Sequence, residues 1–396
     1  MSEVLVVVGR GVPADARLLD EIAEREFAAQ EVTGAVVHAR DTAHLRSLLA
    51  ERETAVVLPG PGDRALAGRV PEPPVTVWVD IERTDTAPAH VRRIQGRGVQ
   101  GLAWGIRHAV HRMRHPGILR VPYGPAPDQW ADLYLPQPSA HGTRPAAPAS
   151  DAGDRPSAGV RSVKPASGHH CLPDPAPGAA GPPVVTLIHG GYWRSIWAAD
   201  LMEPLCADLL QRGFAVWNVE YRRPDLHGWD ATTEDVATAL STLHTTARGE
   251  MDLSRVAVAG HSAGGQLALR AAADGAGVAL AVSLAGVLDL EAGDRRWLSA
   301  GAVAHALGHP SHEPGTGRYA ASSPLLRVPL GVPQLVVQGA EDDLDLVDFS
   351  RRYAVAARAA GDDVTYLELP GHHFDVINPE SPIWRATASA ITAALA

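Results

Sequence analysis

Apolar residues recur along this chain with two different periods, and the alternation of the two predicts strands separated by helices. Short apolar runs at residues 4–8, 55–58 and 75–79 predict buried strands. Over residues 14–30, by contrast, apolar residues return every three or four positions, which predicts an amphipathic helix. Strands that alternate with helices favour a parallel sheet covered on both faces, so we expect an α/β fold.

The same alternation continues to the end of the chain. Further strands are predicted at 36–37, 130–135, 183–188, 214–219, 256–259, 278–284, 334–338 and 364–369. Further helices are predicted around 45–49 and at 102–113, 201–210, 233–247, 266–273, 346–360 and 382–395. An irregular region at 286–332 breaks the pattern, and such excursions often form a lid or a pocket wall.

One segment departs from the pattern altogether. Residues 138 to about 182 are rich in Pro, Gly, Ala and Ser and contain almost no large apolar side chains. Such a segment cannot bury enough surface to offset its ordering entropy, so we predict a disordered insertion. We therefore expect a small α/β domain at 1–117 and a larger one at 118–396 that contains the insertion.

Composition and charge narrow the class of protein. The chain has 396 residues and a net charge of -10, so no general affinity for nucleic acid or anionic membranes is expected. It has two cysteines, which is too few for a disulfide framework and suits a reducing cytoplasm. The apolar run at the N-terminus is too short for a signal peptide, so we expect a cytoplasmic protein.

A glycine-rich turn follows the predicted strand at 256–259. Its sequence, Gly-His-Ser-Ala-Gly at 260–264, matches the G-x-S-x-G pattern and leads into a predicted helix. In a strand–turn–helix context this pattern indicates a nucleophile elbow, in which Gly260 and Gly264 allow a sharp turn and Ser262 is held above the sheet edge. By itself the motif describes an ordinary strand-to-helix turn equally well.

Three further features are predicted at the same edge of the sheet as Ser262. His-Gly-Gly at 189–191 follows one predicted strand, an acid follows the strand at 334–338, and a histidine follows the strand at 364–369. The order Ser, Asp, His is the chain order of α/β-hydrolases, and ligands of open α/β sheets bind at the carboxyl ends of the strands.

The chain from residue 120 onward, without the insertion, resembles an α/β-hydrolase of the esterase or kynurenine formamidase (arylformamidase) type. The resemblance rests on His-Gly-Gly-Tyr-Trp at 189–193, Gly-His-Ser-Ala-Gly-Gly at 260–265 and His-His-Phe-Asp at 372–375. It implies a serine hydrolase that cleaves a small carboxylic ester or an aryl formamide through an acyl-enzyme. Bacterial carboxylesterases share most of these features, so a dedicated N-formylkynurenine formamidase is an alternative.

The resemblance also implies a role for each residue of a catalytic triad. Ser262 is the expected nucleophile, His373 the general base and later the acid, and Asp342 the group that orients the imidazole. Asp342 matches the family spacing Gly-x-x-Asp, counted from Gly339. Asp343 and Asp345 are rivals for the acid, and His372 is a rival for the base.

An oxyanion hole is expected from the backbone N–H groups of Gly191, Tyr192 and Ala263. We expect His189 to hold this loop rather than act as a second base. The aromatic residues Tyr192, Trp193 and Trp197 either line a substrate pocket or pack the loop against the sheet.

The first domain resembles the flavodoxin-like fold of type II dehydroquinases. The resemblance rests on Val-Leu-Val-Val-Val-Gly at 4–9, on the strand segment at 75–83, and on Gly-Val-Gln-Gly-Leu-Ala-Trp-Gly at 98–105. The catalytic Tyr of that family is missing from the loop at 10–15, and its His falls on Trp78. We therefore expect a degenerate domain for packing, regulation or association, or another small α/β domain.

Other candidate features carry less weight. His108, His111 and His115 alternate with arginines near the end of the first domain, which favours a solvated basic face over a metal site. We expect no cofactor and no metal, and the chain contains no G-x-x-x-x-G-K-[ST] nucleotide loop. The expected partner is a small-molecule ester or amide, with a homo-oligomer formed through the first domain as a further option. The alternative of another class is a non-catalytic binding or scaffold module.

Overall fold

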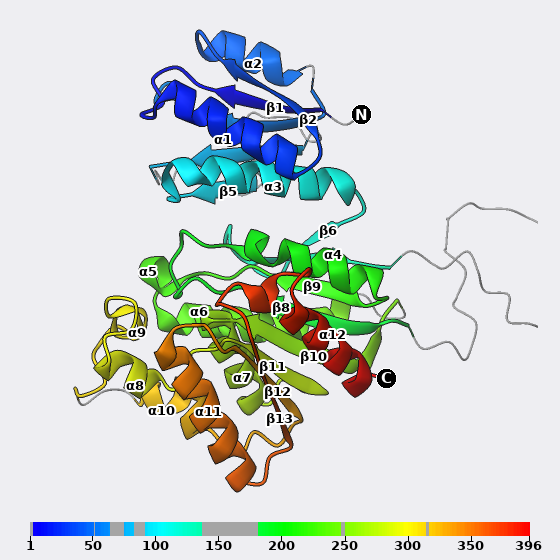
Figure 1. Ribbon diagram of the computed structural model, residues 1–396, viewed down its shortest axis with the longest axis vertical. Helices are drawn as coiled ribbons and strands as arrows, with labels where there is room; N and C mark the ends of the chain where they lie inside the picture. Colours follow the sequence, from blue (N-terminus) through cyan, green and yellow to red (C-terminus); the bar gives the residue numbers. More distant parts are fainter. Residues whose placement is uncertain are drawn as a thin grey trace, which may run out of the picture.

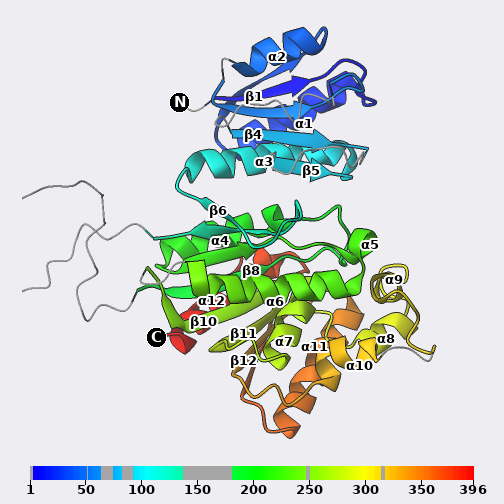
Figure 2. The ribbon, with the colours of Figure 1, turned by 180° about the vertical axis from the view of Figure 1, so that it is seen from behind.

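The computed structural model describes residues 3–50, 52–63, 75–82, 92–136, 181–246, 250–313 and 317–396. These residues form two units, each built on its own sheet, that lie one above the other in Figures 1 and 2. The predicted disordered insertion at 138–182 lies outside the described residues, apart from its last two positions. None of the helices in the described ranges is long and apolar enough to cross a membrane.

The first unit contains a parallel sheet. Among the described residues its strands follow the order β2-β1-β3-β4-β5. They span Glu3–Val8 (β1), Thr33–His38 (β2), Thr54–Leu58 (β3), Val75–Asp80 (β4) and Arg92–Gln95 (β5). This strand order is that of flavodoxin-like folds, so the predicted fold class of the first unit is confirmed.

Helices cover both faces of this sheet. They span Ala16–Ala29 (α1), Thr42–Ala50 (α2) and Gly101–Arg114 (α3). Helices α1 and α3 pack on one face around Leu19 and Ile106, and α2 covers the other through Leu45. Helix α3 lies very close to the sheet at Gly105, where a Cβ atom would lie 2.6 Å from Val79 Cγ2.

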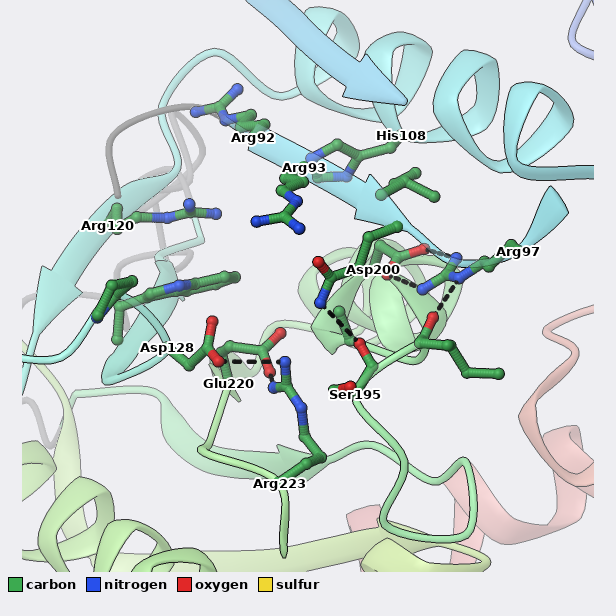
Figure 3. Close-up of a pocket in the computed structure, with 16 residues that line it drawn as sticks. Arg92, Arg93, Arg97, His108, Arg120, Asp128, Ser195, Asp200, Glu220 and Arg223 are labelled. Atoms are coloured by element: carbon green, nitrogen blue, oxygen red, sulfur yellow. Dashed lines mark hydrogen bonds and ion pairs between the residues drawn. The ribbon is translucent and has the colours of Figure 1, made fainter. Parts of the chain in front are cut away.

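The strand β5 was not predicted. Its sequence, Arg-Arg-Ile-Gln, offers one apolar residue, Ile94, for the buried face and no apolar run. As the last strand in the order it pairs on one side with β4, and its polar side chains face the second unit (Figure 3). Hydrophobic periodicity cannot predict such a strand, because most of its side chains face polar residues of the second unit instead of an apolar core.

The second unit is built on a mixed sheet. In the described part of the chain its eight strands follow the order β13-β12-β11-β10-β8-β9-β7-β6, with β6 and β7 antiparallel to their neighbours. They span Leu119–Pro122 (β6), Trp130–Tyr134 (β7), Pro183–Ile188 (β8), Ala215–Val219 (β9), Asp252–His261 (β10), Leu280–Leu284 (β11), Gln334–Gly339 (β12) and Val364–Leu369 (β13).

Each face of this sheet has its own apolar core. Helices α6 (Trp229–Thr246), α7 (Ala263–Ala273) and α11 (Leu344–Ala359) pack on one face. Helices α4 (Glu203–Gln211) and α12 (Pro382–Ala394) cover the other, as Figure 1 shows. Helix α6 begins four residues before the predicted start at Thr233, because Trp229 is buried in the core and extends the apolar face.

The irregular region at 286–332 is more ordered than its sequence predicts. It contains the short helices α8 (Leu290–Arg295), α9 (Ala302–Leu307) and α10 (Arg318–Ser322). These helices are too short for a clear helical period, so their existence depends on tertiary packing, in which α8 contacts α9 and α10, and α10 contacts α7.

Helix α3 lies at the boundary between the two units (Figures 1 and 2). The prediction of a solvated basic face holds for Arg107 and Arg114, which are exposed, but is wrong for Arg112 and His108, which are buried. Arg112 is buried and lies 2.6 Å from the carboxylate of Asp132 on β7, and His111 lies 3.0 Å from the Tyr134 hydroxyl. On this side of α3, polar residues of the second unit thus replace water as the partners of Arg112 and His111.

Candidate active site

The turn after β10 has a strained backbone. Ser262 adopts φ 55° and ψ -118°, a conformation that L-residues rarely populate. The two motif glycines are required by close backbone approaches. A Cβ atom on Gly260 would lie 1.9 Å from the Gly264 carbonyl oxygen, and one on Gly264 would lie 2.1 Å from the Ile188 carbonyl oxygen. The pattern G-x-S-x-G is thus a steric requirement of this turn.

Ser262 lies at the N-terminal end of α7. Its side chain is buried, and its hydroxyl has no hydrogen-bond partner among the described residues. The backbone N–H of Ser262 donates to the Leu284 carbonyl on the neighbouring strand β11, at 2.8 Å. The turn is therefore held by the sheet while the hydroxyl is left available to a ligand.

His373 and Asp342 come together beyond the ends of β13 and β12. His373 Nδ1 lies 2.9 Å from Asp342 Oδ2. The same carboxylate accepts hydrogen bonds from the Gln338 side chain at 2.9 Å and from the Asp343 backbone N–H at 2.6 Å. The Asp342 side chain is only 2% exposed, so these three donors compensate for its loss of water.

The neighbouring acids and the neighbouring histidine have other partners, although Asp343 also lines the cavity. Asp343 accepts from the backbone N–H of Asp345 and caps α11, and Asp345 pairs with Arg296 at 2.7 Å. The His372 side chain is 72% exposed and faces Glu341. In this structure the imidazole of His373 and the carboxylate of Asp342 are the pair in contact.

The loop after β8 brings Gly191 and Tyr192 beside Ser262. Gly191, Tyr192 and Trp193 all have positive φ angles, of 109°, 51° and 56°. A Cβ atom on Gly191 would lie 2.4 Å from the Trp197 side chain. Within the described residues, no hydrogen-bond acceptor is found for the backbone N–H groups of Gly191, Tyr192 or Ala263. These groups are consequently available to a developing negative charge.

The three aromatic residues of this loop divide between the two expected roles. Tyr192 and Trp197 line the cavity next to Ser262. Trp193 is buried instead, where its indole N–H donates to the Gln266 side chain at 3.1 Å and its ring meets Trp229 edge to face.

Two buried histidines beside the site are neutral. Burial lowers the pKa of His189 to about 3, and its ring stacks on Tyr221 with a centroid distance of 4.4 Å. Burial also lowers the pKa of His261 well below its usual value, and this ring packs 4.6 Å from that of His373. Both side chains support the loops around Ser262, and neither is placed as a second base.

The cavity at this edge of the sheet has a volume of about 290 Å³. Its charged, hydroxyl-bearing and imidazole lining residues are Ser262, His261, Asp342, Asp343 and His373. Aromatic and aliphatic side chains supply most of the remaining wall: Tyr192, Trp197, Leu201, Leu346 and Phe374. The part of the chain that the structure describes contains no cluster of three or more His, Cys, Asp or Glu side chains arranged to hold a metal ion.

Comparison with known proteins agrees with this topology. Residues 185–377 match a protein-family model described as the alpha/beta hydrolase fold. The second unit has the alpha/beta hydrolase fold. Carboxyl esterase 2 from the mycorrhizal fungus Tuber melanosporum aligns with a TM-score of 0.50 at 18% identity, over 70% of this chain and 87% of that one. A bacterial heroin esterase aligns with a TM-score of 0.47 at 25% identity, over 55% and 76% of the two chains. No curated protein sequence matches the chain.

Two glutamines of the hydrolase unit were not predicted to matter for the site. Gln338 bridges Asp342 and the Ser350 hydroxyl, which lies 2.8 Å from its side-chain oxygen. Gln266 links Trp193 to the Ser322 carbonyl on α10. Both are buried polar residues within otherwise apolar elements, and that mismatch is the signal in the sequence that singles them out.

Proposed function

We propose that the protein is a serine hydrolase that cleaves a small carboxylic ester or an aryl formamide through an acyl-enzyme. The observation that carries this proposal is the shared cavity of a strained Ser262 and the hydrogen-bonded pair His373–Asp342. Nucleophilic catalysis needs a serine close to an imidazole that a third group orients, and here both side chains line one cavity.

The proposed reaction has two steps. Ser262 Oγ attacks the substrate carbonyl carbon while His373 accepts the hydroxyl proton, and Asp342 stabilises the resulting imidazolium. The tetrahedral oxyanion is bound by the N–H groups of Gly191, Tyr192 and Ala263. The intermediate then expels the alcohol or amine, which takes the proton from His373 as it leaves. Water attacks the acyl-enzyme with the same proton transfers, releasing the acid and restoring Ser262.

The walls of the cavity support a small substrate with an apolar group. A volume of about 290 Å³ lies at the lower end of the range for small-molecule sites. Tyr192 and Trp197 offer aromatic faces to an aryl leaving group. The narrower proposal of an N-formylkynurenine formamidase is supported by the motifs at 189–193 and 372–375.

The first unit is proposed to be a dehydroquinase-like domain without its chemistry. In support, Trp78 stands where the resembling family has its histidine, and this side chain is buried in the core beside α2. A side chain so buried cannot contact a substrate.

The experiment is a comparison of wild type with Ser262→Ala on p-nitrophenyl acetate and N-formylkynurenine. We expect wild-type turnover of at least one substrate and its loss in the variant, together with fluorophosphonate labelling of wild type alone. A strong preference for the formamide would select the narrower proposal. Absence of both turnover and labelling in wild type would favour the non-catalytic binding module.

A further inference from the structure

The first unit contacts the hydrolase unit at the loop that carries Gly191 and Tyr192. The Gln95 side chain, at the end of β5, donates to the Ser195 carbonyl at 3.1 Å. Arg97 Nε donates to the carbonyl of Ile196 at 2.7 Å. Arg97 and Ser195 lie beside a cavity of about 100 Å³ between the units (Figure 3). Two successive carbonyls of this loop are thus held by side chains of the first unit.

Arg97 also fixes the far end of the loop. Its guanidinium group forms a bidentate ion pair with Asp200, with distances of 2.7 and 2.8 Å (Figure 3). The side chains of Arg97 and Asp200 are 4% and 6% exposed, so solvent screens the pair very little. Two parallel N–H···O bonds fix the orientation of the guanidinium group relative to the carboxylate as well as their distance. A single point charge would fix the distance alone.

The same guanidinium group stacks on the loop's aromatic side chain. It lies 4.8 Å from the ring centre of Trp197 and 5.2 Å from that of Trp104 on α3. The two indoles meet edge to face, with ring centres 5.7 Å apart. Trp197 in turn packs against Gly191 and lines the active-site cavity. A continuous set of contacts therefore runs from the first unit to the backbone around the cavity.

This support matters because the loop is strained. Tyr192 and Trp193 are non-glycine residues at positive φ, a conformation that strains the backbone. Such conformations persist only where the surrounding structure determines them, and here part of that structure is the first unit.

We propose that Arg97 is a positioning residue, and that through it the first unit holds the oxyanion loop of the hydrolase unit in its catalytic geometry. This inference rests on the proposed function. It gives the first unit a role in catalysis although none of the residues described for that unit lines the cavity. Because oxyanion stabilisation acts on the transition state, losing this contact should reduce kcat with little change in KM.

The test uses the full chain with Arg97→Met. We expect kcat on p-nitrophenyl acetate to fall by roughly 10–100-fold, with KM within about threefold of wild type. An alkyl trifluoromethyl ketone, whose adduct with Ser262 carries an oxyanion, should lose affinity by a similar factor. Arg97→Lys keeps the positive charge but cannot form the bidentate pair with Asp200. This variant should recover part of the kcat that Arg97→Met loses.

The matched control is Arg107→Met. Arg107 stacks on the same Trp104 at 5.2 Å but pairs with Glu26 inside the first unit and does not touch the loop. The kcat of the Arg107→Met variant should stay within about twofold of wild type. If Arg97→Met fails to fold, Gln95→Met, which keeps the ion pair, should lower kcat by roughly 3–10-fold.

The outcomes separate this inference from the proposed function. A folded Arg97→Met enzyme with wild-type kcat would overturn the inference, as would reduced kcat with unchanged affinity for the trifluoromethyl ketone. If wild type shows neither turnover nor fluorophosphonate labelling, the proposed function fails instead.

Discussion

His373 Nδ1 lies 2.9 Å from Asp342 Oδ2, whereas the adjacent His372 and Asp343 are turned toward other partners. The chain thus contains two pairs of adjacent, chemically identical residues, and one member of each pair makes the His–Asp contact. These pairs give a matched test of the proposed triad.

Asp342→Asn should lower kcat by roughly 10³–10⁴-fold, because the carboxylate would no longer hold the imidazole tautomer or stabilise its charge. His373→Ala should lower kcat by at least as much. Steady-state kinetics with p-nitrophenyl acetate would measure both effects.

Asp343→Asn and His372→Ala serve as the controls. Asparagine still caps a helix well, so Asp343→Asn should retain kcat within about threefold. His372 is largely exposed, and its removal should be equally mild. A large loss in either control, matched by retained activity in Asp342→Asn or His373→Ala, would reassign the triad.

Gly264→Ala should destabilise the protein by at least about 3 kcal/mol, because its Cβ atom would lie 2.1 Å from a backbone carbonyl that cannot move independently of β8. Urea unfolding followed by circular dichroism would measure the change. Gly117→Ala is the control. A Cβ atom there meets nothing within 4 Å, so stability should change by less than about 0.5 kcal/mol. Equal stability of the two variants would contradict the steric explanation of the motif.

Glu203 on α4 provides a pH-dependent test of the boundary between the units. Burial raises the pKa of this carboxyl from 4.5 to about 8, beside the neutral His108 at 2.7 Å. Above pH 4.5 the unfolded chain loses this proton while the folded protein keeps it. The stabilisation is therefore complete below about pH 4.5 and is lost progressively as the pH rises to 8.

Glu203→Gln should remove this dependence, since glutamine is an uncharged side chain of similar shape. Relative to the variant, wild type should lose at most about 4 kcal/mol of unfolding free energy between pH 5 and 8. Urea unfolding at several pH values would measure it. The control is Glu291→Gln, at a more exposed position on α8, which should follow wild type. A constant difference between wild type and Glu203→Gln across this range would exclude a buried neutral carboxyl.

Features that depend on local chemistry and on chain order could be predicted from the amino-acid sequence. The spacing of apolar residues predicted most long helices and buried strands. Burial of one helix face gives a period of three to four residues, and burial of one sheet face gives a period of two. The elbow at 260–264 could be predicted for a similar reason. Its glycines are required because the backbone makes close contacts within the turn and with the adjacent strand β8.

Which polar residues contact one another could be known only from the folded chain. The strand β5 and the buried polar side of α3 have no apolar signature, because residues of the second unit replace water as their partners. The contact of Arg97 with Asp200 joins positions 103 residues apart in the chain. Likewise, which of the adjacent acids reaches His373 depends on the residue at which α11 begins. Long-range pairing of polar groups leaves no period in the sequence, so it could be found only where the two units are packed together.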